Sequence, residues 1–181
     1  MEAALHDFHH LFVALAGDAV DQPVLTIDAA GPPAGQVVAQ RLGLAHASER
    51  RAKRVGDQDF IVVSPDEGGV KRADSFRRAM SRTLGREVPL GFMEKRRSRD
   101  IVSGRGLFAD VKGRTVVILD DLIGTGTTLL RTAVAVREAG AVHVHAAASH
   151  GLFVGQASHV MSDPAFDSIV ITDSVPPFRL D

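Results

Sequence analysis

The chain has 181 residues, of which 45% are hydrophobic and 24% charged, and its formal net charge is −1. These values predict one globular domain and argue against nucleic acid or an acidic membrane surface as a partner. The absence of cysteine excludes disulfides, thiolate zinc sites and a cysteine nucleophile, and no apolar run approaches the roughly 20 residues of a membrane-spanning helix.

The beginning of the chain carries little that predicts function. Its first residues, Met1 to Ala4, lack the basic and then apolar order of a signal peptide, so we expect a cytoplasmic protein. Residues 5–15 have a helical pattern with no strand before it. The first strand is expected at residues 24–27, and Asp28 follows it.

From that point, short β-rich runs alternate with helical patterns. Strands are expected at residues 24–27, 60–63, 88–93, 115–119, 142–148 and 169–172. Helices are expected at residues 35–42, 73–84, 128–139 and 155–161. Several apolar runs are continuous and β-branched, which is typical of strands buried on both faces. The pattern predicts one three-layer α/β domain over residues 1–181, with a mostly parallel central sheet of about five strands and helices on both faces.

The connection between Met93 and Thr115 is long, basic and rich in glycine. Loops of this length in compact domains are usually functional or disordered. We expect residues 96–112 to pack loosely, as part of a flexible flap over about residues 95–113. The alternative is a solvated hairpin without a role.

The strongest motif follows the strand at residues 115–119, where two carboxylates precede a small-residue turn and a helix. Glycines let the backbone approach an anion, and a helix N-terminus adds unpaired N–H groups and a positive dipole. The threonine hydroxyls add further donors, so the loop suits a phosphate monoester. The predicted ligands are Asp120, Asp121, Gly124, Thr125, Gly126, Thr127 and Thr128.

The acid pair needs its own explanation, because carboxylates beside a phosphate would repel it. Two neighbouring carboxylates can accept hydrogen bonds from the two adjacent hydroxyls of a ribose, and ionised acceptors make the stronger bonds. Asp120 and Asp121 therefore indicate ribose 5-phosphate recognition. Neither the P-loop nor the dinucleotide fingerprint fits this spacing. The simplest alternative is a helix capped by Thr127 or Thr128.

A second strand-to-helix loop begins at Ser64. Asp66 could hold Mg²⁺ through oxygen, and Gly68 and Gly69 could admit pyrophosphate oxygens. The alternative is a turn in which Asp66 satisfies its own backbone. His143, His145 and His150 lack a close further ligand for zinc, so core or surface positions are favoured.

Residues 120–128 resemble the phosphoribosyl-diphosphate (PRPP) motif of type I phosphoribosyltransferases and PRPP synthetases. Residues 63–73, 94–97, 149–153 and 171–176 are similar, in the same order, to ribose-phosphate pyrophosphokinase, the PRPP synthetase. The resemblance is to the carboxy-terminal half of that family and implies a phosphoribosyltransferase-like fold, Mg²⁺ as cofactor, a homo-oligomer, and a metal role for Asp66. It also implies that Lys95 and Arg97 are catalytic flap residues, where positive charge would stabilise a transferring diphosphoryl group.

One family motif is incomplete. An Asp-Leu-His motif that serves metal and ATP is represented only by Asp28, a weak metal candidate, and the amino-terminal half of the family has no counterpart. The expected function is transfer from ATP to ribose 5-phosphate, giving PRPP and AMP, with ATP binding less well supported than sugar-phosphate binding. The alternatives are a phosphoribosyltransferase that joins PRPP to a base, and a non-catalytic module that senses PRPP or nucleotides.

Overall fold

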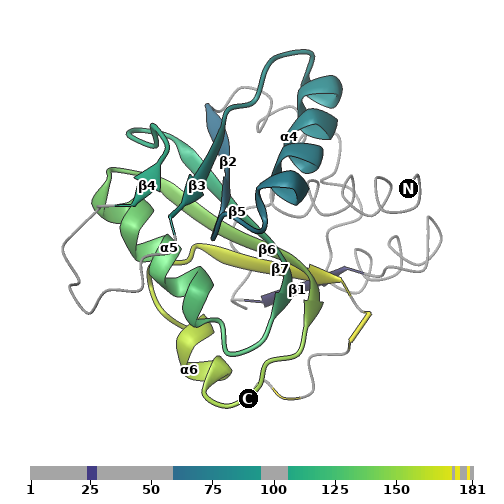
Figure 1. Ribbon diagram of the computed structural model, residues 1–181. Helices are drawn as coiled ribbons and strands as arrows, with labels where there is room; N and C mark the ends of the chain where they lie inside the picture. Colours follow the sequence, from purple (N-terminus) through teal and green to yellow (C-terminus); the bar gives the residue numbers. More distant parts are fainter. Residues whose placement is uncertain (1–23, 28–58, 95–105, 173, 176–178, 180–181) are drawn as a thin grey trace, which may run out of the picture.

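The computed structural model describes residues 24–27, 59–94, 106–172, 174–175 and 179 (Figure 1). The helices expected at residues 5–15 and 35–42 lie outside these ranges, as does Asp28. No helix among the described residues is long and apolar enough to cross a bilayer. The expectation of a cytoplasmic protein stays a prediction.

A seven-stranded sheet forms the centre of the described region, in the order β1-β7-β6-β5-β2-β3-β4. All neighbouring strands are parallel except β3 and β4. The expected α/β fold with a mostly parallel sheet is confirmed, although the sheet is larger than the five strands expected. The strands are β1 (Val24–Ile27), β2 (Phe60–Ser64), β3 (Leu90–Met93), β4 (Leu107–Phe108), β5 (Thr115–Ile123), β6 (His143–Gly151) and β7 (Ser168–Thr172).

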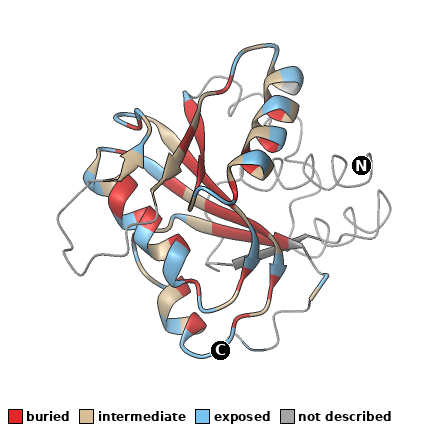
Figure 2. Cartoon of the chain, in the orientation of Figure 1, coloured by how far each residue is buried: buried red, intermediate tan, exposed pale blue. Residues whose placement is uncertain are grey.

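Helices cover both faces of the sheet, as expected (Figure 1). They are α4 (Val70–Leu84), α5 (Thr127–Glu138) and α6 (Ala157–Met161). Successive strand residues point to opposite faces, so Phe60 and Val62 of β2 pack with α4, whereas Ile61 and Val63 join the core beneath α5 and α6. Because both faces are covered, β2 is buried along its whole length, and β5 is buried from Val116 to Leu119 (Figure 2).

The last part of the expected flap differs from the expectation of loose packing. Residues 107–108 form β4, which pairs antiparallel with β3, and the rings of Phe92 and Phe108 stack with centroids 5.0 Å apart. Val111 is 1% exposed within the core beneath α5. One buried valine and two paired residues thus hold residues 106–113 to the domain. Residues 95–105 lie outside the described residues.

The predicted position of the motif at the carboxyl end of a central strand is confirmed. β5 is the middle strand of the seven, and Asp121 and Gly124 lie at its carboxyl end. Because β2, β5 and β6 are parallel, the loops that follow them meet at one edge, where open α/β sheets bind ligands.

Candidate functional site

The β5–α5 loop presents the start of a twelve-residue helix at the sheet edge. Gly126 is the N-cap residue, with a left-handed φ of 78°, and no side chain caps the helix. The alternative of a cap by Thr127 or Thr128 is therefore not what the structure has. A helix start without a side-chain cap leaves its first N–H groups for an anion, which is what a phosphate loop requires.

Gly126 is required for two reasons. Its φ is one that L side chains rarely adopt, and a Cβ built there would overlap Met161 Cε of α6 and lie 3.2 Å from Val160 Cγ1. α6 thus packs directly under the turn. Because Gly126 has no side chain, the loop packs closely on α6, and this contact fixes the position of the start of α5.

The three threonines of the loop face solvent. The Oγ1 atoms of Thr125 and Thr127 lie 3.1 Å apart, and Thr128 is exposed as well. The next residue, Leu129, is 2% exposed and anchors α5 in the core. The hydroxyls therefore point outward from a firmly held helix start, where a ligand phosphate could reach them.

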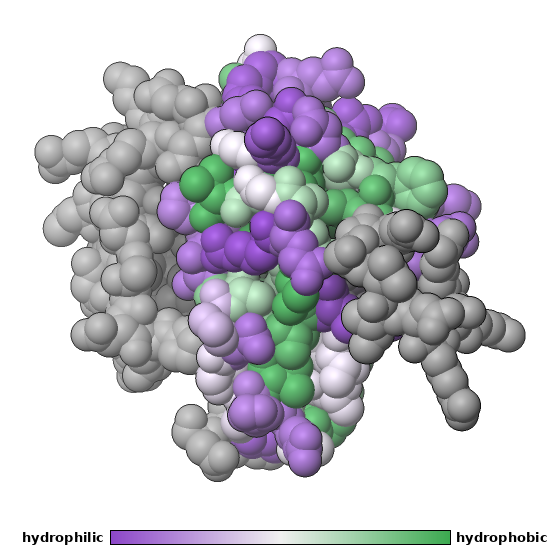
Figure 3. Space-filling model, turned by 90° about the vertical axis from the view of Figure 1, so that its left-hand side faces the viewer, coloured by the Kyte–Doolittle hydropathy of each residue, from purple (hydrophilic) through white to green (hydrophobic). Residues whose placement is uncertain are grey.

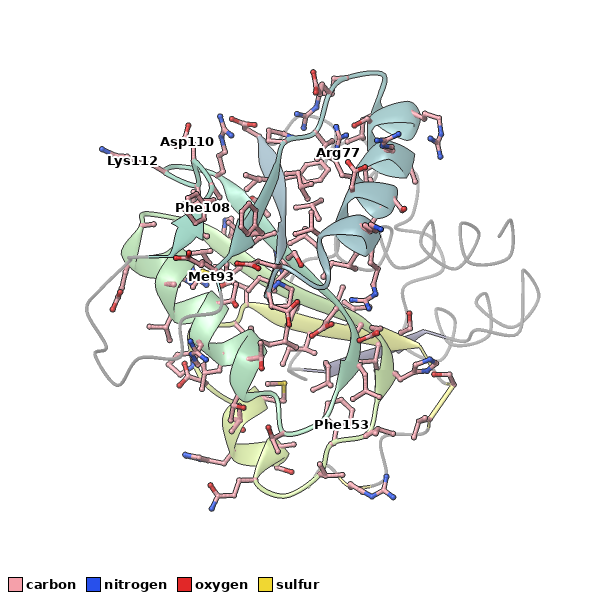
Figure 4. The ribbon with its side chains drawn as sticks, viewed as in Figure 1. Arg77, Met93, Phe108, Asp110, Lys112 and Phe153 are labelled. Atoms are coloured by element: carbon pink, nitrogen blue, oxygen red, sulfur yellow. The ribbon has the colours of Figure 1, made fainter. Side chains whose placement is uncertain are left out.

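The loop after β6 supports the β5–α5 loop from behind. Leu152 and Phe153 donate backbone N–H groups to the Ile123 carbonyl at 2.9 and 3.2 Å, and Val154 donates to the Gly124 carbonyl at 3.0 Å. Phe153 is 2% exposed although its φ is +46°, and its side chain is drawn in Figure 4. Leu152 and Phe153, which belong to the run singled out only by resemblance, thus have a physical role in holding the β5–α5 loop.

The acid pair is bridged by a cation that the sequence did not single out. Arg72 Nη1 donates to Asp120 Oδ1 at 3.2 Å, and Arg72 Nη2 donates to Asp121 Oδ2. Burial, with the neighbouring Asp121 carboxylate adding to it, raises the pKa of Asp120 to about 6 against the opposing charge of Arg72. The available signal was weak: two adjacent basic residues, Lys71 and Arg72, in the first turn after a glycine-bearing loop.

The β2–α4 loop is organised by its own side chains. The Ser64 hydroxyl donates to the Asp66 carbonyl at 2.7 Å, and Asp66 Oδ1 accepts the Gly69 N–H at 2.9 Å. The turn in which Asp66 satisfies its own backbone is therefore present. A Cβ at Gly69 would lie 2.6 Å from Ser64 Oγ, so this glycine lets the turn close tightly.

The fit of Mg²⁺ to this loop rests on a single carboxylate. Within the described ranges, no group of three or more His, Cys, Asp or Glu side chains could hold a metal. Asp66 accepts the Gly69 N–H with Oδ1, and its second carboxylate oxygen is left for a metal. Mg²⁺ is typically held by one or two carboxylates together with substrate phosphates, so the donor set fits a metal that arrives with a phosphorylated ligand.

The other predicted residues fall into two groups. Lys95, Arg97 and Asp28 lie outside the described residues and stay predictions. His143 and His145 share one face of β6, with ring centroids 6.4 Å apart, at the strand's amino-terminal end and thus away from the site. Burial lowers the pKa of His145 to about 4.

Comparisons with known proteins agree with this geometry. A family model for the phosphoribosyl transferase domain matches residues 33–174. A ribose-phosphate pyrophosphokinase from Vibrio vulnificus is 43% identical over 121 residues, which cover 66% of this chain and 37% of the relative. Another from a Nostoc species is 37% identical over 119 residues, covering 65% and 34%. The chain therefore spans little more than a third of these relatives.

Among solved structures, a phosphoribosylpyrophosphate synthetase from Mycobacterium smegmatis superposes with a TM-score of 0.57 and 26% identity. The match covers 81% of this chain and 56% of the other. The family match includes both strand-to-helix loops, the acid pair and the supporting loop after β6. The chain belongs to the phosphoribosyl transferase domain family.

Proposed function

We propose that this chain binds ribose 5-phosphate, or the same unit of PRPP, and that it serves a PRPP synthetase-type transfer from ATP. The observation that carries the proposal is the acid pair directly followed by an uncapped helix start at the carboxyl end of the central strand. The similarity to ribose-phosphate pyrophosphokinases supports the same choice of ligand.

The two ends of the ligand would have different partners. The 5-phosphate would take the N–H groups at the start of α5 and the outward hydroxyls of Thr125 and Thr127. The two ribose hydroxyls would donate to the carboxylates of Asp120 and Asp121. This division keeps the phosphate on the positive helix end and the acids on the uncharged part of the sugar.

In the proposed reaction, the anomeric hydroxyl of ribose 5-phosphate attacks the β-phosphorus of ATP. The new bond joins the sugar oxygen to that phosphorus, the bond to the AMP oxygen breaks, and the hydroxyl proton is lost. Lys95 and Arg97 would stabilise the charge on the transferring diphosphoryl group. Mg²⁺, with Asp66 as one ligand, would neutralise phosphate charge when bound.

A homo-oligomer is part of the proposal. Figure 3 shows apolar side chains between hydrophilic ones on the face that carries β4 and α5. Phe108 is 56% exposed there and Val134 is 40% exposed. Apolar surface of this kind favours association. Sedimentation velocity should show a species larger than one chain, and a clean monomer at high concentration would contradict this part.

Calorimetry with ribose 5-phosphate and Mg²⁺ tests the ligand. Replacing both Asp120 and Asp121 by Asn should weaken binding strongly, because each lost bond to a charged acceptor is worth roughly 1.5–3 kcal/mol. Asp110→Asn is a matched control, since Asp110 is exposed and belongs to the connection before β5. Equal binding by the double variant, or no binding by the unaltered chain at millimolar ligand, would reject the proposal.

A further inference from the structure

Arg72 is the cation nearest the proposed sugar site among the described residues, and its contacts are specific. Its two terminal nitrogens donate to different carboxylates, Nη1 to Asp120 and Nη2 to Asp121. The guanidinium therefore takes one oxygen of each carboxylate and leaves the second oxygen of each for another donor. A lysine could not reproduce this planar fork, because its ammonium is a single point charge.

The backbone around Arg72 is shaped to allow this contact. The residue lies in the first turn of α4, and β2, which leads into α4, is the sheet neighbour of β5. A Cβ at Gly69 would lie 3.4 Å from Arg72 Nη1. That distance is ordinary van der Waals contact, so the guanidinium passes close to Gly69 on its way to the acid pair.

The charges at this edge would otherwise be unfavourable for a phosphorylated sugar. Asp120 is partly buried, and it lies next to Asp121 in a strand. Among the described residues, the charged groups that face Asp120 are Asp121 on its own strand and Arg72 on α4. Without Arg72, two adjacent carboxylates would stand beside the phosphate loop with no compensating charge.

We propose that Arg72 is a positioning residue of the sugar site, which holds Asp120 and Asp121 as an ionised, aligned pair of acceptors for the two ribose hydroxyls. This inference rests on the proposed function and deepens it. The oxygens that Arg72 does not use become the acceptors for the diol. Arg72 itself need not contact the sugar.

The competing explanation is a salt bridge that merely fastens α4 to the sheet. Partly exposed ion pairs of this kind are usually worth little. The two explanations differ in their dependence on pH. If Arg72 keeps the pair ionised, then its loss lets Asp120 hold a proton at higher pH, and sugar binding should be recoverable by raising the pH.

The test is calorimetry of ribose 5-phosphate binding from about pH 5 to about pH 9. Because the ligand phosphate also titrates, the affinity of each variant is divided by that of the unaltered chain at the same pH. Arg72→Ala should weaken binding about tenfold or more near neutrality and less than about threefold at the alkaline end. Arg72→Lys should restore part of the loss, because the charge is kept. Arg78→Ala is the control: Arg78 lies on the same helix and pairs with Asp74.

A second measurement separates this inference from the proposed function. Carboxyl ¹³C NMR should show that Asp120 titrates at higher pH in Arg72→Ala than in the unaltered chain, with or without sugar. An unchanged Asp120 titration, an unchanged affinity, or a loss by the same factor at every pH would each overturn the inference. Absence of sugar binding in the unaltered chain would instead reject the proposed function, while the NMR titration still decides whether Arg72 keeps the pair ionised.

Discussion

The β2–α4 and β5–α5 loops invite comparison, because each joins a buried parallel strand to a helix at the same edge and each contains two glycines. In the β2–α4 loop, Asp66 accepts the N–H of Gly69, which is the N-cap residue of α4 and has a φ of −81°, and no side chain caps the helix itself. In the β5–α5 loop, Gly126 stands at the N-cap with φ 78° and no side chain caps the helix. The two loops therefore differ in the backbone conformation of the N-cap glycine and in the Asp66 bond that closes the β2–α4 turn, and not in side-chain capping of the helix.

The largest difference between the two loops should come from placing alanine at their glycines. Gly126→Ala requires an unfavourable φ and an overlap with Met161, so phosphate affinity should fall at least about tenfold and the chain should lose about 1–3 kcal/mol of stability. Gly69→Ala should cost less stability and leave phosphate affinity nearly unchanged, because alanine adopts a φ of −81° freely and its Cβ would overlap only the Ser64 hydroxyl.

Calorimetry measures the phosphate affinity of the two alanine variants, and denaturant melts measure their stability. Second-site variants test the cause of each defect. Ser64→Ala should relieve much of the Gly69→Ala defect. Met161→Ala should relieve the overlap at Gly126 but not its φ. If both alanine variants bound ribose 5-phosphate as the unaltered chain does, the distinction between the loops would be lost.

A smaller effect should separate the two roles of Asp66. Asp66→Asn keeps an oxygen that can accept the Gly69 N–H, whereas Asp66→Ala removes it. We expect Asp66→Ala to lose about 1 kcal/mol of stability and Asp66→Asn much less. Both should weaken the dependence of ligand binding on Mg²⁺, because the carboxylate is gone. Thermal melts and a Mg²⁺ titration measure the two roles, and an unaltered Mg²⁺ dependence in both variants would exclude Asp66 as a ligand.

The smallest expected effect is a pH dependence of stability that originates at Asp120. Burial raises its folded-state pKa from 3.8 to about 6, so between these values the folded chain holds more protons than the unfolded one. Stability contributed by this group is therefore full at low pH and declines as pH rises toward about 6. Asp120→Asn should flatten that part of the curve in melts at several pH values. A slope that persists unchanged in Asp120→Asn would assign it to other groups.

Local signals predicted the fold class and the strand, turn and helix around the β5–α5 loop well. The apolar run before Asp120 and the small-residue turn after it are local features, and the helix begins at Thr127, one residue before its expected start. β4 was not expected, because a two-residue strand carries no periodicity and forms only by pairing with β3. Likewise, Val111 gave no local sign that it would be buried.

The sequence by itself determined most of the strands and the turn before α5, because these depend on neighbours two to four positions apart. Only the tertiary structure decided which of them meet. Arg72 and Asp120 are 48 positions apart, and they touch because the crossovers place β2 beside β5. The same packing places α6 under Gly126, so that Met161 and Val160 lie against the turn before α5. Such contacts depend on strand order and side-chain direction, which no local pattern encodes.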